Sequence, residues 1–290
     1  MDFERIEVRP IAGALGAEIA GVDLAADLDN SAMAEIRQAF FDHAVVFFLD
    51  QQLTPEQHIA FARRFGEIDI NKFFEQLEGY PEIAQVRKEP LDTQNIGGGW
   101  HTDHSYDAAP AMGSMLYARE LPALGGDTLF ASMYAAYEAL SPGMRRMLAG
   151  LRAVHSGARA FGPDAHANNA GREAQFKLSE IALAEVEHPV VCTHPDTGRK
   201  YLYVNGGFTL RFSEMTEAES LPLLLFLYRH AARPEFTCRY RWQPGTLAFW
   251  DNRCTQHFAV NDYQGLRRLM HRVTVLDDKA ADAAYSETAA

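Results

Sequence analysis

The residues from Gly97 to Tyr106 constrain this chain more than any other stretch, because they place an imidazole and a carboxylate two positions apart after three consecutive glycines. In an extended segment, side chains i and i+2 point to the same side, so His101 and Asp103 can bind one ion together while Thr102 faces away. A His-x-Asp pair alone is weak evidence, since short pairs arise by chance in a chain with 11 histidines. A metal site therefore requires a third ligand from elsewhere.

Composition narrows the class of protein. The chain has 290 residues, of which 47% are apolar and 23% charged, which predicts a single globular domain over residues 1–280 and a frayed Ala-rich tail over residues 281–290. Its formal charge of −12 disfavours nucleic acid or an anionic membrane surface as a partner. The N-terminus has no signal-peptide pattern, no apolar run is long enough to span a membrane, and the three cysteines form no Cys-x-x-Cys pair. These features favour a cytoplasmic protein.

Periodicity and turn residues predict an α+β fold. Helices are expected where N-cap residues precede apolar residues at helical spacing: from residue 30, over 54–66, over 133–140 and 141–148, and over 216–230. Short apolar runs predict strands over 44–49, 114–118, 128–131, 152–155, 190–194, 201–204, 236–242, 246–250 and 267–276. Residues 68–74 and 88–99 look irregular. Short strands with helices between the strand blocks favour a sheet sandwich or barrel that carries the site in its mouth.

The third ligand is expected at His257, which follows the strand predicted over 246–250 and precedes a basic strand. On that strand Arg268 and Arg272 share one face, because side chains alternate. Two neighbouring guanidinium groups repel each other unless an anion lies between them, and a carboxylate is their preferred partner. Two histidines and one carboxylate, with open positions, form the ligand set of non-haem Fe(II) oxygenases. A dicarboxylate co-substrate would explain the arginines.

Four motifs together resemble the taurine and phenoxyacetate dioxygenases, which depend on Fe(II) and 2-oxoglutarate. The motifs are Trp100-His101-Thr102-Asp103, Gly125-Gly126-Asp127-Thr128, the run from Trp250 to His257, and Arg267-Arg268-Leu269-Met270-His271-Arg272. The resemblance covers nearly the whole chain and implies a double-stranded β-helix (jelly-roll) core with flanking helices. It also implies hydroxylation with O2 as co-substrate and release of succinate and CO2, and homodimers or homotetramers.

The resemblance assigns roles position by position. It implies that His101, Asp103 and His257 hold iron, that Thr128 and Arg268 hold the distal carboxylate of 2-oxoglutarate, and that Arg272 lies between the co-substrate and an acidic substrate group. The residues that it implies for the substrate pocket are Asn71, Phe74, Phe161 and Phe208. In taurine enzymes a histidine and an asparagine contact the substrate where Asn71 and Gly97 stand here, which argues against taurine itself. His104 and Tyr106 receive no role.

The expected substrate is therefore a small acidic organic molecule such as an organosulfonate or alkyl sulfate, and an aryloxy or other carboxylic acid is the alternative. Two other classes stay open: a zinc hydrolase, which would need a general base beside the metal, and a non-catalytic barrel that binds an oxoacid without forming succinate. Residues 157–170 form a long polar connection, either disordered or a lid over the site.

Overall fold

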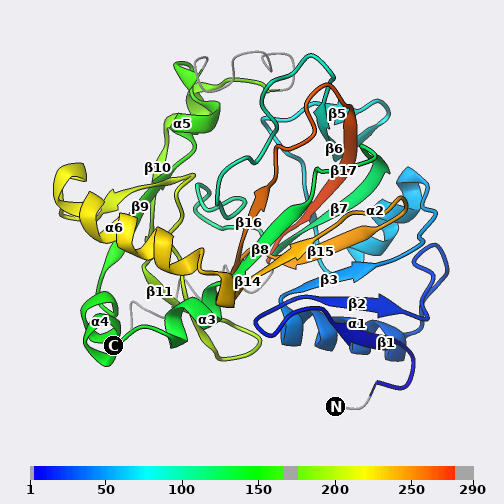
Figure 1. Ribbon diagram of the computed structural model, residues 1–290, viewed down its shortest axis with the longest axis horizontal. Helices are drawn as coiled ribbons and strands as arrows, with labels where there is room; N and C mark the ends of the chain where they lie inside the picture. Colours follow the sequence, from blue (N-terminus) through cyan, green and yellow to red (C-terminus); the bar gives the residue numbers. More distant parts are fainter. Residues whose placement is uncertain (1–2, 166–175, 278–290) are drawn as a thin grey trace.

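The computed structural model describes residues 3–165 and 176–277 (Figure 1). Within these ranges the largest sheet has nine strands, in the order β1-β2-β3-β15-β7-β17-β6-β5, with β4 paired to β17. Their bounds are β1 Glu7–Pro10, β2 Ala17–Ala20, β3 Val45–Phe48, β15 Leu247–Asp251, β7 Gly113–Glu120, β17 Arg268–Val275, β6 Tyr80–Lys88, β5 Gln76–Leu77 and β4 Ile68–Asp69.

Three smaller sheets complete the strands of the described ranges. One follows the order β14-β8-β16, one the order β10-β9-β13, and one pairs β11 with β12. Their bounds are β14 Thr237–Tyr240, β8 Thr128–Ser132, β16 Thr255–Ala259, β10 Glu185–Pro189, β9 Arg152–Ser156, β13 Thr209–Phe212, β11 Val191–Thr193 and β12 Lys200–Leu202. The helices are α1 Asn30–His43, α2 Pro55–Arg63, α3 Met133–Glu138, α4 Pro142–Leu148, α5 Ala158–Phe161 and α6 Glu217–Ala231, with 3-10 turns η3 Glu180–Leu183 and η4 Pro234–Phe236.

The central strands of the large sheet are buried on both faces, and alternation along β3 shows why. Val46 and Phe48 pack into the core under α1 and α2, while Val45 and Phe47 pack into a second core shared with β8 and α6. Figure 1 shows α1 and α2 beside the large sheet and α6 on the opposite side of the molecule. The second core therefore lies between the large sheet and the smaller sheets. No helix in the described ranges is long and apolar enough to cross a membrane.

Local sequence signals explain where the helices begin. Asp29 accepts a hydrogen bond from the Ala32 backbone N–H at the start of α1, and Thr54 and Thr216 form capping boxes at α2 and α6. These helices were predicted, as were the paired strands β11 and β12 and the strands β15 and β17, whereas β16, which carries His257, was not predicted as a strand. The α+β class is thus confirmed.

The longest strand that the pattern does not predict is β6, which lies between β17 and β5 in the large sheet. Its sequence contains only a few apolar residues, because one face of the strand is only partly buried. The stretch predicted to be irregular at 68–74 contributes the two-residue strand β4. In the polar connection 157–170, the described part contains α5, and residues 166–170 lie outside the described ranges, as does the predicted tail 281–290.

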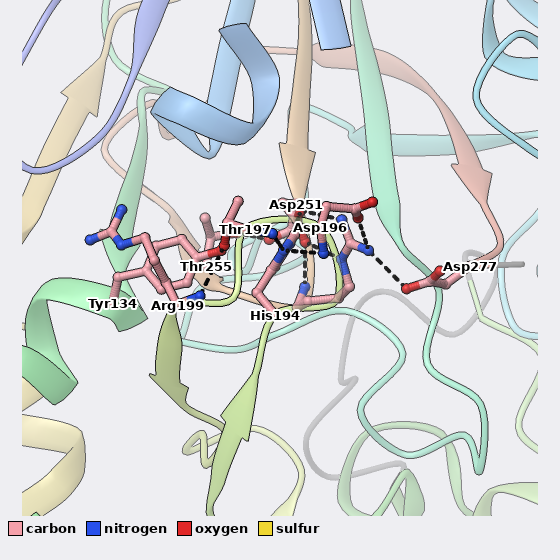
Figure 2. Close-up of polar contacts among 9 residues, drawn as sticks. Tyr134, His194, Asp196, Thr197, Arg199, Asp251, Thr255 and Asp277 are labelled. Atoms are coloured by element: carbon pink, nitrogen blue, oxygen red, sulfur yellow. Dashed lines mark hydrogen bonds and ion pairs between the residues drawn. The ribbon is translucent and has the colours of Figure 1, made fainter. Parts of the chain in front are cut away.

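The turn between β15 and β16 is held by a buried network of charges (Figure 2). Asp251 accepts hydrogen bonds from Arg253 Nε at 2.9 Å and Nη2 at 2.7 Å, and it lies 2.9 Å from Nε2 of His194. The Nη1 group of Arg253 also donates to Asp196 at 3.0 Å and Asp277 at 2.9 Å. Burial alone would raise the pKa of the Asp251 carboxyl, but the Arg253 guanidinium lowers it, so Asp251 stays ionised.

The same cluster, with Cys254, has the spacing of a metal site. However, Nδ1 of His194 accepts the backbone N–H groups of Asp196 and Thr197 at 3.2 Å each, which leaves the proton on Nε2 for Asp251. Both ring nitrogens of His194 are therefore used within the protein. We assign this cluster a structural role: it fixes the turn that leads into β16.

Replacing Arg253 by methionine is expected to destabilise the fold by about 3–5 kcal/mol, because it leaves buried carboxylates without their partner. Urea denaturation of wild type and variant measures the difference. Arg233→Met, which removes a half-exposed partner of Glu235, is the control and should leave the midpoint unchanged.

The destabilisation caused by Arg253→Met should also depend on pH. The folded pKa of Asp251 is depressed, so its contribution is present above the unfolded pKa of about 3.9 and is lost as pH falls toward the folded value. The gap between wild type and Arg253→Met should therefore narrow below about pH 4. A gap that stays constant in acid would contradict the assigned network.

Candidate active site

The structure brings His101, Asp103 and His257 together. An antiparallel bridge joins the first and last of them: the His257 backbone N–H donates to His101 O at 2.9 Å, and the His101 N–H donates to His257 O at 3.2 Å. One ligand atom from each of the three side chains lies within 4.8 Å of the others. The Nε2 atoms of His101 and His257 lie 3.6 and 4.0 Å from the same oxygen of Asp103. The three side chains thus converge on one point.

His101 is oriented by its own loop. Its Nδ1 lies 2.8 Å from the carbonyl of Gly99, which accepts the Nδ1 proton and leaves the Nε2 lone pair directed at Asp103. Gly97 has a positive φ of 77°, and a Cβ there would lie 3.1 Å from Cε1 of His101. Gly97 is therefore needed for close approach of the backbone to the imidazole.

Asp103 is buried beside a cation. Arg272 Nη1 lies 3.2 and 3.3 Å from its two oxygens, and the Ser114 hydroxyl donates to Oδ2 at 3.0 Å. Burial alone would raise the pKa of Asp103, but the Arg272 guanidinium holds it well below its usual range. The carboxylate is thus ionised and fixed in direction.

His257 is held neutral. Burial, followed by the neighbouring His101, lowers the pKa of His257 to about 3. Two imidazoles with free lone pairs and one ionised carboxylate fit a divalent cation such as iron.

These three side chains lie in a cavity of about 620 Å³. Arg272, Arg268 and Thr128 also line it, so the predicted face of β17 does point to the site. Met270, which shares that face, packs into the core next to the cavity, while Val273 on the opposite face packs under α2. The predicted residues that line the cavity are His101, Asp103, His257, Thr128, Arg268, Arg272, Phe74, Phe161 and Phe208.

Arg268 and Thr128 form a polar end of the cavity. The Thr128 hydroxyl oxygen accepts a hydrogen bond from Trp242 Nε1 at 2.9 Å, which leaves the hydroxyl proton available. Arg268 is buried, its guanidinium lies 5.6 Å from the Trp242 ring, and its Nε and Nη2 have no hydrogen-bond partner in the described chain. Burial lowers the pKa of Arg268, and no carboxylate forms an ion pair with it within residues 3–165 and 176–277. An anion is expected here.

The other end of the cavity is aromatic. The Phe161 ring stacks on Phe73 at 4.5 Å, and Tyr106 lies 4.8 Å from Phe208, edge to face. The Arg272 guanidinium lies 4.5 Å from the ring of Phe74 and so links this end to the metal ligands. Tyr106, which was left without a role, also lines the cavity. Phe176, Arg159 and Tyr228, which the pattern did not single out, line it as well.

Asn71 is the exception among the predicted site residues, because it does not line the cavity. Its side-chain carbonyl accepts the backbone N–H groups of Phe73 at 2.9 Å and Phe74 at 3.0 Å. Asn71 therefore holds the aromatic wall in place from outside the set of residues that line the cavity. His104 likewise stays outside the cavity lining and bonds Asp107 at 2.9 Å.

Two residues that support the site, Ser114 and Trp242, were not predicted from the sequence. Both lie on predicted strands, and alternation could have placed them on a buried face. Their partners, Asp103 and Thr128, lie on other elements, so only the folded chain shows the contacts.

Comparison with known proteins agrees with this geometry. Residues 7–274 match the sequence model of the "Taurine catabolism dioxygenase TauD, TfdA family". An alkylsulfatase of Acinetobacter baylyi is 34% identical over 97% of this chain and 88% of its own. An alpha-ketoglutarate-dependent sulfate ester dioxygenase of Pseudomonas putida is 36% identical over 93% of this chain and 89% of its own.

A solved structure extends the likeness to three dimensions. The crystal structure of a putative alpha-ketoglutarate-dependent taurine dioxygenase from Burkholderia xenovorans superposes with a TM-score of 0.80 at 38% identity, covering 94% of this chain and 93% of that one. From the family match over residues 7–274 and the convergence of His101, Asp103 and His257, we conclude that the chain belongs to the TauD/TfdA family of 2-oxoglutarate-dependent dioxygenases.

Proposed function

We propose that this protein hydroxylates a small acidic organic substrate with an apolar body, using Fe(II), 2-oxoglutarate and O2, and that alkyl sulfates and organosulfonates are its substrate class. The observation that carries the proposal is the convergence of two imidazoles and an ionised carboxylate in the same cavity as Arg268, which has no ion pair within the described residues. We also propose the jelly-roll core, one domain over residues 1–280, a cytoplasmic location and a homodimer or homotetramer, on the strength of the family resemblance.

His101, Asp103 and His257 would hold the iron through two Nε2 atoms and one carboxylate oxygen. When bound, iron supplies the redox chemistry that couples reduction of O2 to decarboxylation of 2-oxoglutarate into succinate and CO2. The protein contributes orientation: Gly99 fixes the His101 ring, while Arg272 and Ser114 fix the carboxylate. Such outer partners keep the ligands in one geometry before the ion arrives.

Arg268 and the Thr128 hydroxyl would hold the distal carboxylate of the co-substrate. Both groups have unused donors, and a carboxylate accepts from both. This end and the metal ligands line one and the same cavity, so a short dicarboxylate can contact both.

The substrate would lie along the aromatic wall. Phe74, Phe161 and Phe208 offer apolar contact, and Asn71 keeps the Phe74 backbone in place. Within the described residues the Nε of Arg272 has no hydrogen-bond partner, and its guanidinium lies beside Phe74, so its charge favours an acidic head at that point. The similarity to an alkylsulfatase and to a sulfate ester dioxygenase supports this substrate class. An aryloxy acid is the alternative, because it also fits the aromatic wall.

A hydrolytic function is disfavoured by the lining of the cavity. Among the described residues, Asp103 is its only carboxylate and His101 and His257 are its only imidazoles, so no general base remains once these three bind a metal. A zinc hydrolase also has no use for the uncompensated Arg268.

Asp103→Ala is expected to abolish turnover, because two imidazoles alone do not hold the ion in a fixed geometry. Succinate formation measures activity, and circular dichroism checks the fold. Full activity in a folded variant would contradict the assigned site.

Arg268→Ala is expected to raise the KM for 2-oxoglutarate about tenfold or more, because one charge-assisted contact contributes about 1.5–3 kcal/mol. Steady-state assays at varied 2-oxoglutarate measure this. The exposed Arg233→Ala serves as control. An unchanged KM in Arg268→Ala would show that the dicarboxylate binds elsewhere.

The substrate class is tested by anaerobic addition of Fe(II) and 2-oxoglutarate, followed by alkyl sulfates, alkyl sulfonates and aryloxy acids. The visible charge-transfer band of the chelate should appear, and it should shift with sulfate or sulfonate substrates at lower concentrations than with aryloxy acids. If aryloxy acids shift it best, the alternative substrate class holds. If no band forms, the non-catalytic or zinc interpretation takes over.

A further inference from the structure

Lys88, the last residue of β6, is a buried lysine whose ammonium has no hydrogen-bond partner among the described residues. Lys88 is only 1% exposed, and its Nζ lies 4.8 Å from the centre of the Tyr263 ring. A cation–π contact attracts a cation but does not neutralise it. Burying an unpaired ammonium costs several kcal/mol, so a charge in this position calls for an anion.

Strand register places Lys88 beside the co-substrate end of the cavity. Lys88 and Arg268 are directly opposed in the antiparallel pair β6–β17, so both side chains leave the sheet on the same face. Val86, two residues earlier on β6, shares this face and lines the cavity, as Arg268 does. Lys88 itself does not line the cavity. The charge of Lys88 therefore acts on the co-substrate end of the cavity from behind its lining residues.

The nearby carboxylates are engaged elsewhere. Glu89 pairs with Arg267 at 3.1 Å, and Asp127 and Asp262 pair with Arg239 at 2.6 and 3.4 Å. No ion pair to Lys88 or Arg268 occurs within residues 3–165 and 176–277. Two adjacent buried cations thus repel each other until an anion arrives, and in a low-dielectric interior each one strengthens the field at that anion.

We propose that Lys88 is a positioning residue for the co-substrate: together with Arg268 it makes this end of the cavity doubly positive and selects an oxoacid that carries a distal carboxylate. The inference rests on the proposed function, and it adds a charge that discriminates between dicarboxylic and monocarboxylic oxoacids. Lys88 acts through its field and through Arg268.

The experiment compares two ligands that share the chelating end. 2-Oxoglutarate has the distal carboxylate, whereas 2-oxopentanoate has the same chain length without it. Their dissociation constants are measured on anaerobic Fe(II)-loaded protein from the charge-transfer band, and independently by calorimetry. The variants are Lys88→Met, which removes the charge, Lys88→Arg, which keeps it, and Lys200→Met as a matched control, since Lys200 is an exposed lysine on β12.

Lys88→Met should weaken binding of 2-oxoglutarate about tenfold or more while 2-oxopentanoate changes less than about twofold. Lys88→Arg and Lys200→Met should keep the wild-type ratio of the two constants. The KM for 2-oxoglutarate should rise in Lys88→Met with kcat at saturation nearly unchanged.

Equal weakening of both oxoacids would show that Lys88 only supports the fold, and unchanged binding of both would show that its charge has no role; either result overturns the proposal. If Lys88→Met does not fold, Lys88→Gln replaces it as the variant without the charge. Its ratio of the dissociation constants of 2-oxoglutarate and 2-oxopentanoate is then compared with that of Lys88→Arg. Failure of the wild-type protein to bind 2-oxoglutarate at all would instead overturn the proposed function.

Discussion

The site depends first on the backbone bridge between His101 and His257. These residues are far apart in the sequence, and the two hydrogen bonds between their backbones place both imidazoles over the same oxygen of Asp103. The bridge is possible because the glycines before His101 let the loop lie against β16. Since β16 is paired along its length with β8, the position of His257 is set by a sheet. One ligand is thus rigid, and the loop ligands are fastened to it.

Buried charge is distributed in two ways around this bridge. Asp251 with Arg253, and Asp103 with Arg272, are paired carboxylates and guanidinium groups that hold the β15–β16 turn and the ligand loop in place. Arg268 is buried without such a pair in the part of the chain that the structure describes. Since an isolated buried charge is costly, a fold keeps one where a ligand of opposite sign completes it. The contrast between paired and unpaired cations therefore separates the scaffold of the site from its binding end.

Much of the site could be predicted because several of its residues lie at short, regular spacings in the sequence. His101 and Asp103 are two residues apart, and Arg268 and Arg272 are separated by an even number of residues on one strand, so alternation alone places each pair on a common face. Helices with capping boxes were predictable for the same reason. Strand β6 was not, because its residues are only partly apolar and its pairing with β17 depends on a distant part of the chain. Asn71 was assigned to the substrate by position, yet its carbonyl is used by neighbouring backbone groups.

The sequence by itself determined the ligand types, the α+β class and the faces on which the arginines lie, because these follow from residue chemistry and from periods of two and 3.6 residues. Only the tertiary structure decided which side chains meet: Ser114 with Asp103, Trp242 with Thr128, and Lys88 with the face of Arg268. The physical reason is that these contacts join different strands. Strand order and register are set by the packing of the whole core, and no short stretch of sequence encodes them.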